Sequence, residues 1–180
     1  MKTLFTQLVR RVLTGLTLLS LGATLVYAST TRNAALEGLD LVGEARMQVL
    51  FWNIYDARLY APDGNFDADA SFALSLTYLR DLQGEKIAER SVQEMRKQGF
   101  SDERTLARWY EELALMIPDV GDGNEIVGVA DAEGSTQFYF DGELIGAFDE
   151  PEFTKAFFAI WLDERTSEPQ FRAQLLGGAS

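Results

Sequence analysis

The run Leu41–Tyr60, LVGEARMQVLFWNIYDARLY, constrains the fold more than any other part of the chain. It is the longest stretch rich in β-branched, aromatic and aliphatic residues, and it contains no proline, which is typical of β-strands. A chain reversal at Leu50-Phe51 would make the run two antiparallel strands. Because no Gly, Asn or Pro marks that reversal, a single bent strand is the alternative.

Two residues of this run, Arg46 and Tyr55, are candidates for binding a negatively charged ligand. If the chain reverses at Leu50-Phe51, they lie directly opposite each other, with Cβ atoms roughly 5 Å apart on one face of the sheet. A guanidinium and a phenolic hydroxyl can together hold one carboxylate. The alternative is that Arg46 is solvated, as most arginines are, and that Tyr55 is ordinary sheet packing.

Three further arginines, Arg58, Arg80 and Arg90, are rival cations that sequence spacing does not exclude. We expect each of them on the surface. Arg58 is expected on the side of the sheet opposite to Arg46.

Residues 1–28 have the pattern of a secretory signal peptide. Lys2, Arg10 and Arg11 form a positive region, an uncharged apolar run follows, and Val26-Tyr27-Ala28 supplies small residues for cleavage after Ala28. The apolar run is shorter than the roughly 20 residues that a spanning helix needs, so cleavage is favoured over an uncleaved anchor. We therefore expect a periplasmic or secreted protein in which residues 29–180 form one domain.

The composition excludes several classes of function. The net charge is −12, and it becomes −15 without residues 1–28, which contain three basic and no acidic residues. This charge argues against nucleic acid and anionic membrane surfaces as partners. The chain has no Cys and no His, which excludes disulfides, Ser-His-Asp and Cys-His catalysis and the usual zinc sites. We expect no metal and no cofactor.

The rest of the chain predicts alternating groups of strands and helices. Alternation of apolar and other residues in 72–78 indicates a half-buried strand, and Asp141-Gly142 is a strong hairpin signal. The acidic loop 119–125 lacks the ligand spacing of an EF-hand and is interpreted as a connection. The predicted helices are 85–98 and 101–117, the later strands are 125–130, 136–140 and 143–147, and two more helices follow Asp149 and Ser167.

Local signals mark the helix ends. Gly99 is suited to end the first helix, and Ser101 is expected to cap the second. Asp149 and Ser167 are expected to cap the last two helices, each with proline in the first turn. The predicted fold is α+β, with about six mostly antiparallel strands and the helices on one face. An apolar slot between sheet and helices is then a natural small-molecule site.

The sequence resembles the chalcone isomerase-like family, in a bacterial exported form, over roughly Leu39 to Gly177. The matching segments are Val42–Arg46, Tyr55–Tyr60, Phe157–Leu162, Ser167 and Leu175–Gly177. The resemblance implies an open-faced β-sandwich with a ligand cleft between the sheet and the helices.

The resemblance also implies two branches of function. Fatty-acid-binding members hold a carboxylate with an Arg and a Tyr, which match Arg46 and Tyr55 here. Plant isomerases, which close a chalcone into a flavanone, carry Thr in place of that Tyr. Their Tyr and Asn on the first helix align with Gln83 and Arg90 of this chain.

We therefore favour a non-catalytic binding protein for a fatty acid or similar apolar carboxylate, held by Arg46 and Tyr55. Each methylene buried in the slot would contribute roughly 0.8 kcal/mol. The alternatives are an isomerase or intramolecular lyase acting on an enone, with Arg46 as oxyanion holder and Tyr55 as proton donor, and an interaction module without a ligand.

Overall fold

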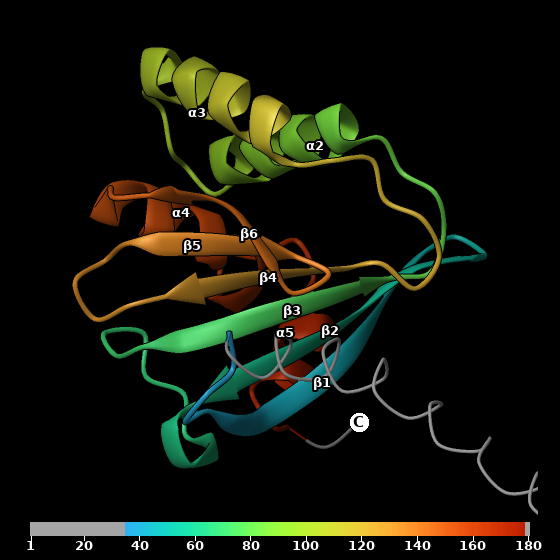
Figure 1. The fold of residues 1–180 in the computed structure, drawn as a ribbon, viewed down its shortest axis with the longest axis vertical. Helices are drawn as coiled ribbons and strands as arrows, with labels where there is room; N and C mark the ends of the chain where they lie inside the picture. Colours follow the sequence, from blue (N-terminus) through green and yellow to red (C-terminus); the bar gives the residue numbers. More distant parts are fainter. Residues whose placement is uncertain (1–34, 179–180) are drawn as a thin grey trace, which may run out of the picture.

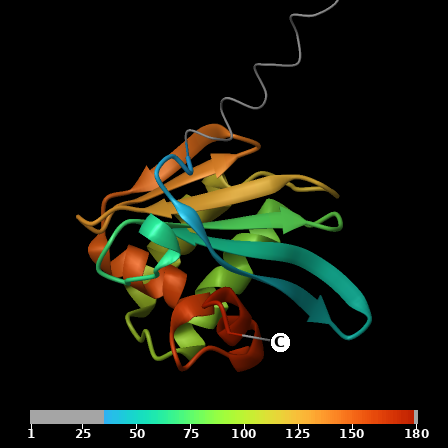
Figure 2. The same cartoon turned by 90° about the horizontal axis from the view of Figure 1, so that it is seen from below.

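The computed structural model describes residues 35–178, which form one antiparallel sheet covered by helices on one face (Figures 1 and 2). Each of the six strands pairs with the next one in the chain, so the spatial order is β1-β2-β3-β4-β5-β6. This confirms the predicted α+β, open-faced architecture. The strands are β1 (Asp40–Val49), β2 (Trp52–Ala61), β3 (Phe72–Tyr78), β4 (Glu125–Ala130), β5 (Thr136–Phe140) and β6 (Glu143–Phe148). The helices are α2 (Gly84–Lys97), α3 (Glu103–Met116), α4 (Pro151–Leu162) and α5 (Pro169–Leu175), with a short 3₁₀ turn at Pro62–Gly64.

The chain reverses at Leu50-Phe51 as predicted, and Val49 pairs with Trp52 across the turn. Leu50 has a φ of 56°, in the left-handed region that is unfavourable for a residue with a branched side chain. Only the first of the two turn residues has a positive φ, which is a position where hairpins normally use glycine. The absence of Gly at this turn is therefore a real departure from common hairpin chemistry.

Strand β3 was expected to be half-buried, and this prediction is wrong. Six of its seven residues are buried, including Ala73 and Ser75 on the face away from the helices. That face is covered because Ala73 packs with Ala35 and Val127 in a second, smaller hydrophobic cluster. Residues distant in the sequence therefore cover both faces of this central strand. The alternation of residue types within the strand does not reveal this second layer of cover.

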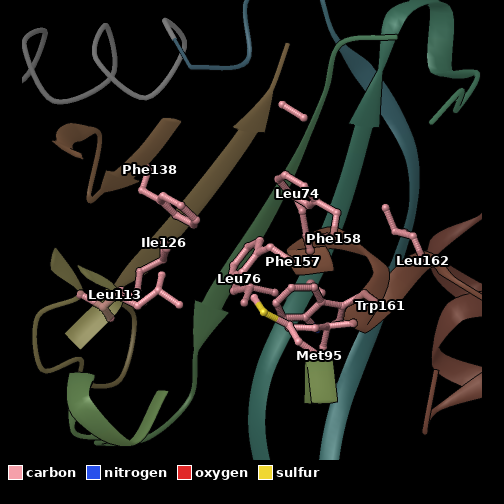
Figure 3. Packing of buried hydrophobic residues seen from close by; sticks show 14 of the residues in the cluster. Leu74, Leu76, Met95, Leu113, Ile126, Phe138, Phe157, Phe158, Trp161 and Leu162 are labelled. Atoms are coloured by element: carbon pink, nitrogen blue, oxygen red, sulfur yellow. The ribbon is translucent and has the colours of Figure 1, made fainter. Parts of the chain in front are cut away.

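The main core lies between the sheet and the helices and is dominated by aromatic side chains. Phe138, Phe148, Phe153 and Phe157 contact one another with ring-centroid distances between 3.6 and 6.2 Å. Figure 3 shows Phe157 and Trp161 of α4 among side chains from β3, β4 and α2. Burial of such large side chains supplies the main driving force for this fold, since no disulfide is possible.

Three of the predicted helix caps differ in the structure. Asp102, not Ser101, caps α3, and its carboxylate accepts hydrogen bonds from the backbone N–H groups of Arg104 and Thr105. Helices α4 and α5 begin after Glu150 and Glu168, and neither start has a side-chain cap. Ser167 donates its hydroxyl to Glu94 instead. The predicted prolines in the first turns are confirmed, as is the end of the first helix just before Gly99, which has a positive φ.

The predicted signal peptide, residues 1–28, lies outside the described residues. Within residues 35–178, no helix has the length and apolar character needed to cross a lipid bilayer.

The edge strand β1 packs closely against α5 through Gly43. A Cβ at this position would overlap the Gln174 carbonyl oxygen and lie 2.7 Å from that of Leu175. At Gly146, on the opposite edge strand, an added Cβ would meet only the flexible side chain of Met116, at 2.7 Å from its Cε. The two glycines therefore form a matched pair of probes for the docking of α5.

We predict that Gly43→Ala lowers the free energy of unfolding by about 1–3 kcal/mol, because backbone carbonyls cannot move aside without displacing α5. Gly146→Ala should cost less, since Met116 can change rotamer. Urea unfolding of both variants measures the difference. An equal loss for the two would contradict the close docking of α5 on β1.

Candidate functional site

A largely apolar cavity of about 410 Å³ lies between the first strands and helices α2 and α4. This volume falls in the range of small-molecule sites. Strands β1 to β4 form one wall, and side chains of α2, α4 and the segment after α4 form the other. Its apolar lining includes Met47, Ile54, Leu76, Ile87, Ile126 and Trp161.

Tyr55 is the polar side chain that β2 contributes to the lining of this cavity. Its hydroxyl oxygen accepts a hydrogen bond of 2.9 Å from the indole N–H of Trp161. Its ring makes edge contacts with those of Tyr78 and Phe171, at 5.9 and 6.1 Å. Because Trp161 uses a lone pair of the hydroxyl, the phenolic proton is still available for donation to a ligand.

Burial raises the pKa of Tyr55 to about 12, although the Trp161 N–H bond and nearby Arg90 act in the opposite direction. Burial also raises the pKa of neighbouring Tyr78. At neutral pH both phenols are therefore protonated. They are hydrogen-bond donors and weak acids in this site, and neither is a ready base.

Arg46 does not face Tyr55, so the predicted pairing of these residues is wrong. The register places Met47 opposite Tyr55 and Arg46 opposite Asp56. Since Gln48 pairs with Asn53 and Met47 with Tyr55, Ile54 is an extra residue in β2 and forms a bulge. One extra residue reverses which face the following side chains occupy, so Arg46 and Tyr55 lie on opposite faces of the sheet.

On the outer face, Arg46 forms a two-point ion pair with Asp56, with N–O distances of 2.6 and 2.8 Å. Arg58 lies on this same face and pairs with Glu44 at 3.2 Å. The expectation that Arg58 would lie opposite to Arg46 is also wrong, because the bulge moves both Asp56 and Arg58 to the side of Arg46. Neither arginine lines the cavity.

Of the three rival arginines, Arg90 lines the cavity with Tyr55, and Lys86 is a second cation in its lining. Arg90 lies on α2 and its side chain is 63% exposed. Its Nη2 is 2.7 Å from Glu94 Oε1, and Lys97 Nζ binds the same oxygen at 2.9 Å. Ser167 donates to the other carboxylate oxygen at 3.1 Å.

Glu94 itself is nearly inaccessible to solvent. Burial tends to raise the pKa of this carboxyl, but the contacts from Lys97, Arg90 and Ser167 outweigh it and hold the pKa below its usual value. Glu94 is therefore charged at neutral pH and fixes a small polar cluster at one end of an otherwise apolar cavity. Lys86 and Glu168 also line the cavity.

Sequence reasoning missed Glu94, Trp161 and Ser167 as parts of the site. The Arg90–Glu94 spacing is a common surface pattern on helices, and nothing in the sequence near Trp161 indicates a partner for its N–H. Only the fold brings these residues to Tyr55. Arg80, the remaining rival, lies over the ring of Trp52 at 4.8 Å and does not line the cavity.

Comparison with known proteins agrees with this architecture. The model of the chalcone isomerase-like family matches residues 25–177. The chain belongs to the chalcone isomerase-like family, as the resemblance implied. Among solved structures, a fatty-acid binding protein of Arabidopsis thaliana is similar, with a TM-score of 0.60 and 14% identity over 78% of this chain and 87% of that one. At this identity the likeness shows the fold alone. Comparison with curated protein sequences finds no match.

The pKa of Tyr55 predicts how stability depends on pH. Its pKa is about 12 in the folded chain, above the value of 10.0 for an unperturbed phenol. A raised folded-state pKa means that the stabilisation is complete below pH ~10 and is lost as the pH rises toward ~12. We expect wild type to lose more stability than Tyr55→Phe between pH ~9 and ~11.5. Urea unfolding at the two pH values tests this, and identical losses would contradict the burial of this hydroxyl.

Proposed function

We propose that this protein binds a fatty acid or a similar apolar carboxylate in the cavity between the sheet and helices α2 and α4. The observation that carries the proposal is the polarity of the cavity, which is apolar along most of its wall and polar where Arg90, Glu94 and Ser167 contact one another. An acyl chain gains roughly 0.8 kcal/mol for each methylene removed from water, so a site of this kind needs few polar contacts. The fatty-acid binding protein with a similar fold supports the same choice of ligand class.

Arg90 and Tyr55 are the side chains proposed to hold the carboxylate. Arg90 is close enough to Tyr55 to lower the pKa of its hydroxyl. Because Glu94 is also bound by Lys97 and Ser167, it would keep two partners if Arg90 turned toward a ligand. Tyr55 would donate its phenolic proton, while Trp161 continues to hold its oxygen. The proposal thus retains Tyr55 from the sequence prediction and transfers the cationic role from Arg46 to Arg90.

We further propose that the protein is not an isomerase. Tyr55 is a protonated phenol at neutral pH, Arg90 is engaged with Glu94, and Gln83 is the residue that precedes α2. A phenol with a pKa of about 12 is a poor proton donor or acceptor for catalysis at neutral pH. Saturable, stereoselective ring closure of a 2′-hydroxychalcone by the purified protein would contradict this part of the proposal.

Export remains part of the proposal, on the strength of residues 1–28. A mature N-terminus at Ser29 in protein recovered from outside the cytoplasm would support it. Full-length protein retained in a membrane fraction would count against it.

Binding of a fluorescent fatty acid distinguishes the two candidate arginines. We expect Arg90→Ala to weaken binding by about 1–2 kcal/mol, somewhat less than for a fully buried charged contact, because this side chain is partly solvated. Tyr55→Phe should cost about 0.5–1.5 kcal/mol, since it removes one neutral hydrogen bond.

Arg46→Ala is the matched control. It removes an arginine from the hairpin that carries Tyr55, but on the outer face of the sheet, so it should leave the affinity for the fatty acid unchanged. A loss confined to Arg46→Ala would move the anion contact outside the cavity and overturn the assignment of Arg90. Equal affinities for all variants would leave no role for either cation and contradict the carboxylate site.

A further inference from the structure

The tip of the β1–β2 hairpin is the most exposed apolar surface of the described chain. Four consecutive apolar residues, Val49 to Trp52, occupy it, and Leu50 and Phe51 are 86% and 95% exposed. Figure 2 shows this hairpin projecting beyond the neighbouring strands. Water is an unfavourable environment for so many adjoining apolar side chains.

The backbone conformation of the turn is also unfavourable for the residue that occupies it. Leu50 adopts a positive φ, where glycine or asparagine would be less strained and more soluble. Neither folding nor solubility therefore accounts for a leucine and a phenylalanine at this turn. Their side chains are suited to an apolar environment outside the protein.

The apolar tip ends at a sharp polar boundary. Gln48 and Asn53, the next pair along the hairpin, are joined by a side-chain hydrogen bond of 2.6 Å. The apolar end is thus two residues deep, or roughly 7 Å at ~3.3 Å per residue. This depth matches the roughly 5–10 Å to which interfacial segments enter a lipid bilayer.

A cation lies directly behind this tip. The Arg80 guanidinium stacks over the Trp52 ring at 4.8 Å. No carboxylate among residues 35–178 forms an ion pair with Arg80, and its Nε is buried without a hydrogen bond in that part of the chain. A tryptophan with an adjacent arginine is the combination found where a protein meets lipid headgroups, because the ring prefers the interface and the cation pairs with phosphate.

From these features we infer that the Val49–Trp52 tip inserts into the surface of a phospholipid bilayer, with Arg80 at the level of the headgroup phosphates. A stable protein interface engages roughly 20–30 residues on each side, far more than this convex tip offers. A fluid bilayer can surround a convex tip without a matching groove. The chain's net charge of −12 favours a zwitterionic over an anionic lipid surface.

The position of the tip gives this contact a consequence for the cavity. Val49 lines the cavity and is 54% exposed, so the cavity wall continues into the tip. Contact with a bilayer would therefore place the cavity beside the lipid phase from which an apolar molecule can enter. The inference about the tip does not depend on which molecule the cavity holds.

Vesicles of phosphatidylcholine with brominated acyl chains test the insertion in the mature chain, residues 29–180, which lacks the apolar run before Ser29. Bromine quenches only tryptophans near the acyl chains, and Trp109 and Trp161 are buried, so the signal reports Trp52. Wild type should show quenching and a blue-shifted emission. Trp52→Phe should remove both, and Leu50→Ser/Phe51→Ser should remove most of the quenching without unfolding the chain.

Leu115→Ser is the matched control, because Leu115 on α3 is 90% exposed yet lies outside the tip, and its quenching should equal that of wild type. Three results would overturn the inference. The first is no quenching of wild type. The second is quenching of the Leu50→Ser/Phe51→Ser variant equal to that of wild type. The third is a loss of quenching in Leu115→Ser as large as that in the tip variant. A wild-type dimer that becomes monomeric on Leu50→Ser/Phe51→Ser, without vesicle binding, would assign the tip to a second copy of the chain instead.

Discussion

The extra residue Ile54 in β2 decides what the cavity contains. Without it, Arg46 and Tyr55 would pair on one face, and a strong cation would stand at the centre of the inner sheet surface. With it, Met47 and Tyr55 face the helices, while Arg46, Asp56 and Arg58 face outward. The bulge thus keeps the cavity wall apolar and leaves one phenolic hydroxyl within it.

An apolar wall with one polar end is well suited to an amphiphile. Burying the charge of an arginine on the inner sheet would need full compensation by partners, whereas the Arg90 side chain is 63% exposed and pairs with Glu94. The contacts of Glu94 with Lys97 and Ser167, which remain if Arg90 turns to a ligand, order this part of the cavity before any ligand arrives. Such preorganisation lowers the entropy cost of binding.

Much of the fold follows from the sequence. The strand limits and the antiparallel order are local or nearest-neighbour properties, and hydrophobic alternation and turn residues such as Asp141-Gly142 report them. The reversal at Leu50-Phe51 was predicted without any turn residue to mark it. The site is less accessible to such reasoning. Ile54 is as apolar and β-branched as an ordinary strand residue, so nothing in the sequence marks it as the extra one, and a one-residue shift then misplaced Arg46. The partners of Glu94 and Tyr55 are 73 and 106 residues away in the chain, and only the packing of α4 and the following segment brings them together.

Titration of the protein with dodecanoate, below its micelle concentration, tests the central claim most directly when the indole N–H resonances of the three tryptophans are followed by NMR. The N–H of Trp161 is bonded to the Tyr55 hydroxyl inside the cavity, whereas that of Trp109 is bonded to Glu150 in the core away from it. The account predicts a saturable shift of the Trp161 resonance with little change at Trp109. An unchanged Trp161 resonance at saturating ligand would contradict binding in this cavity.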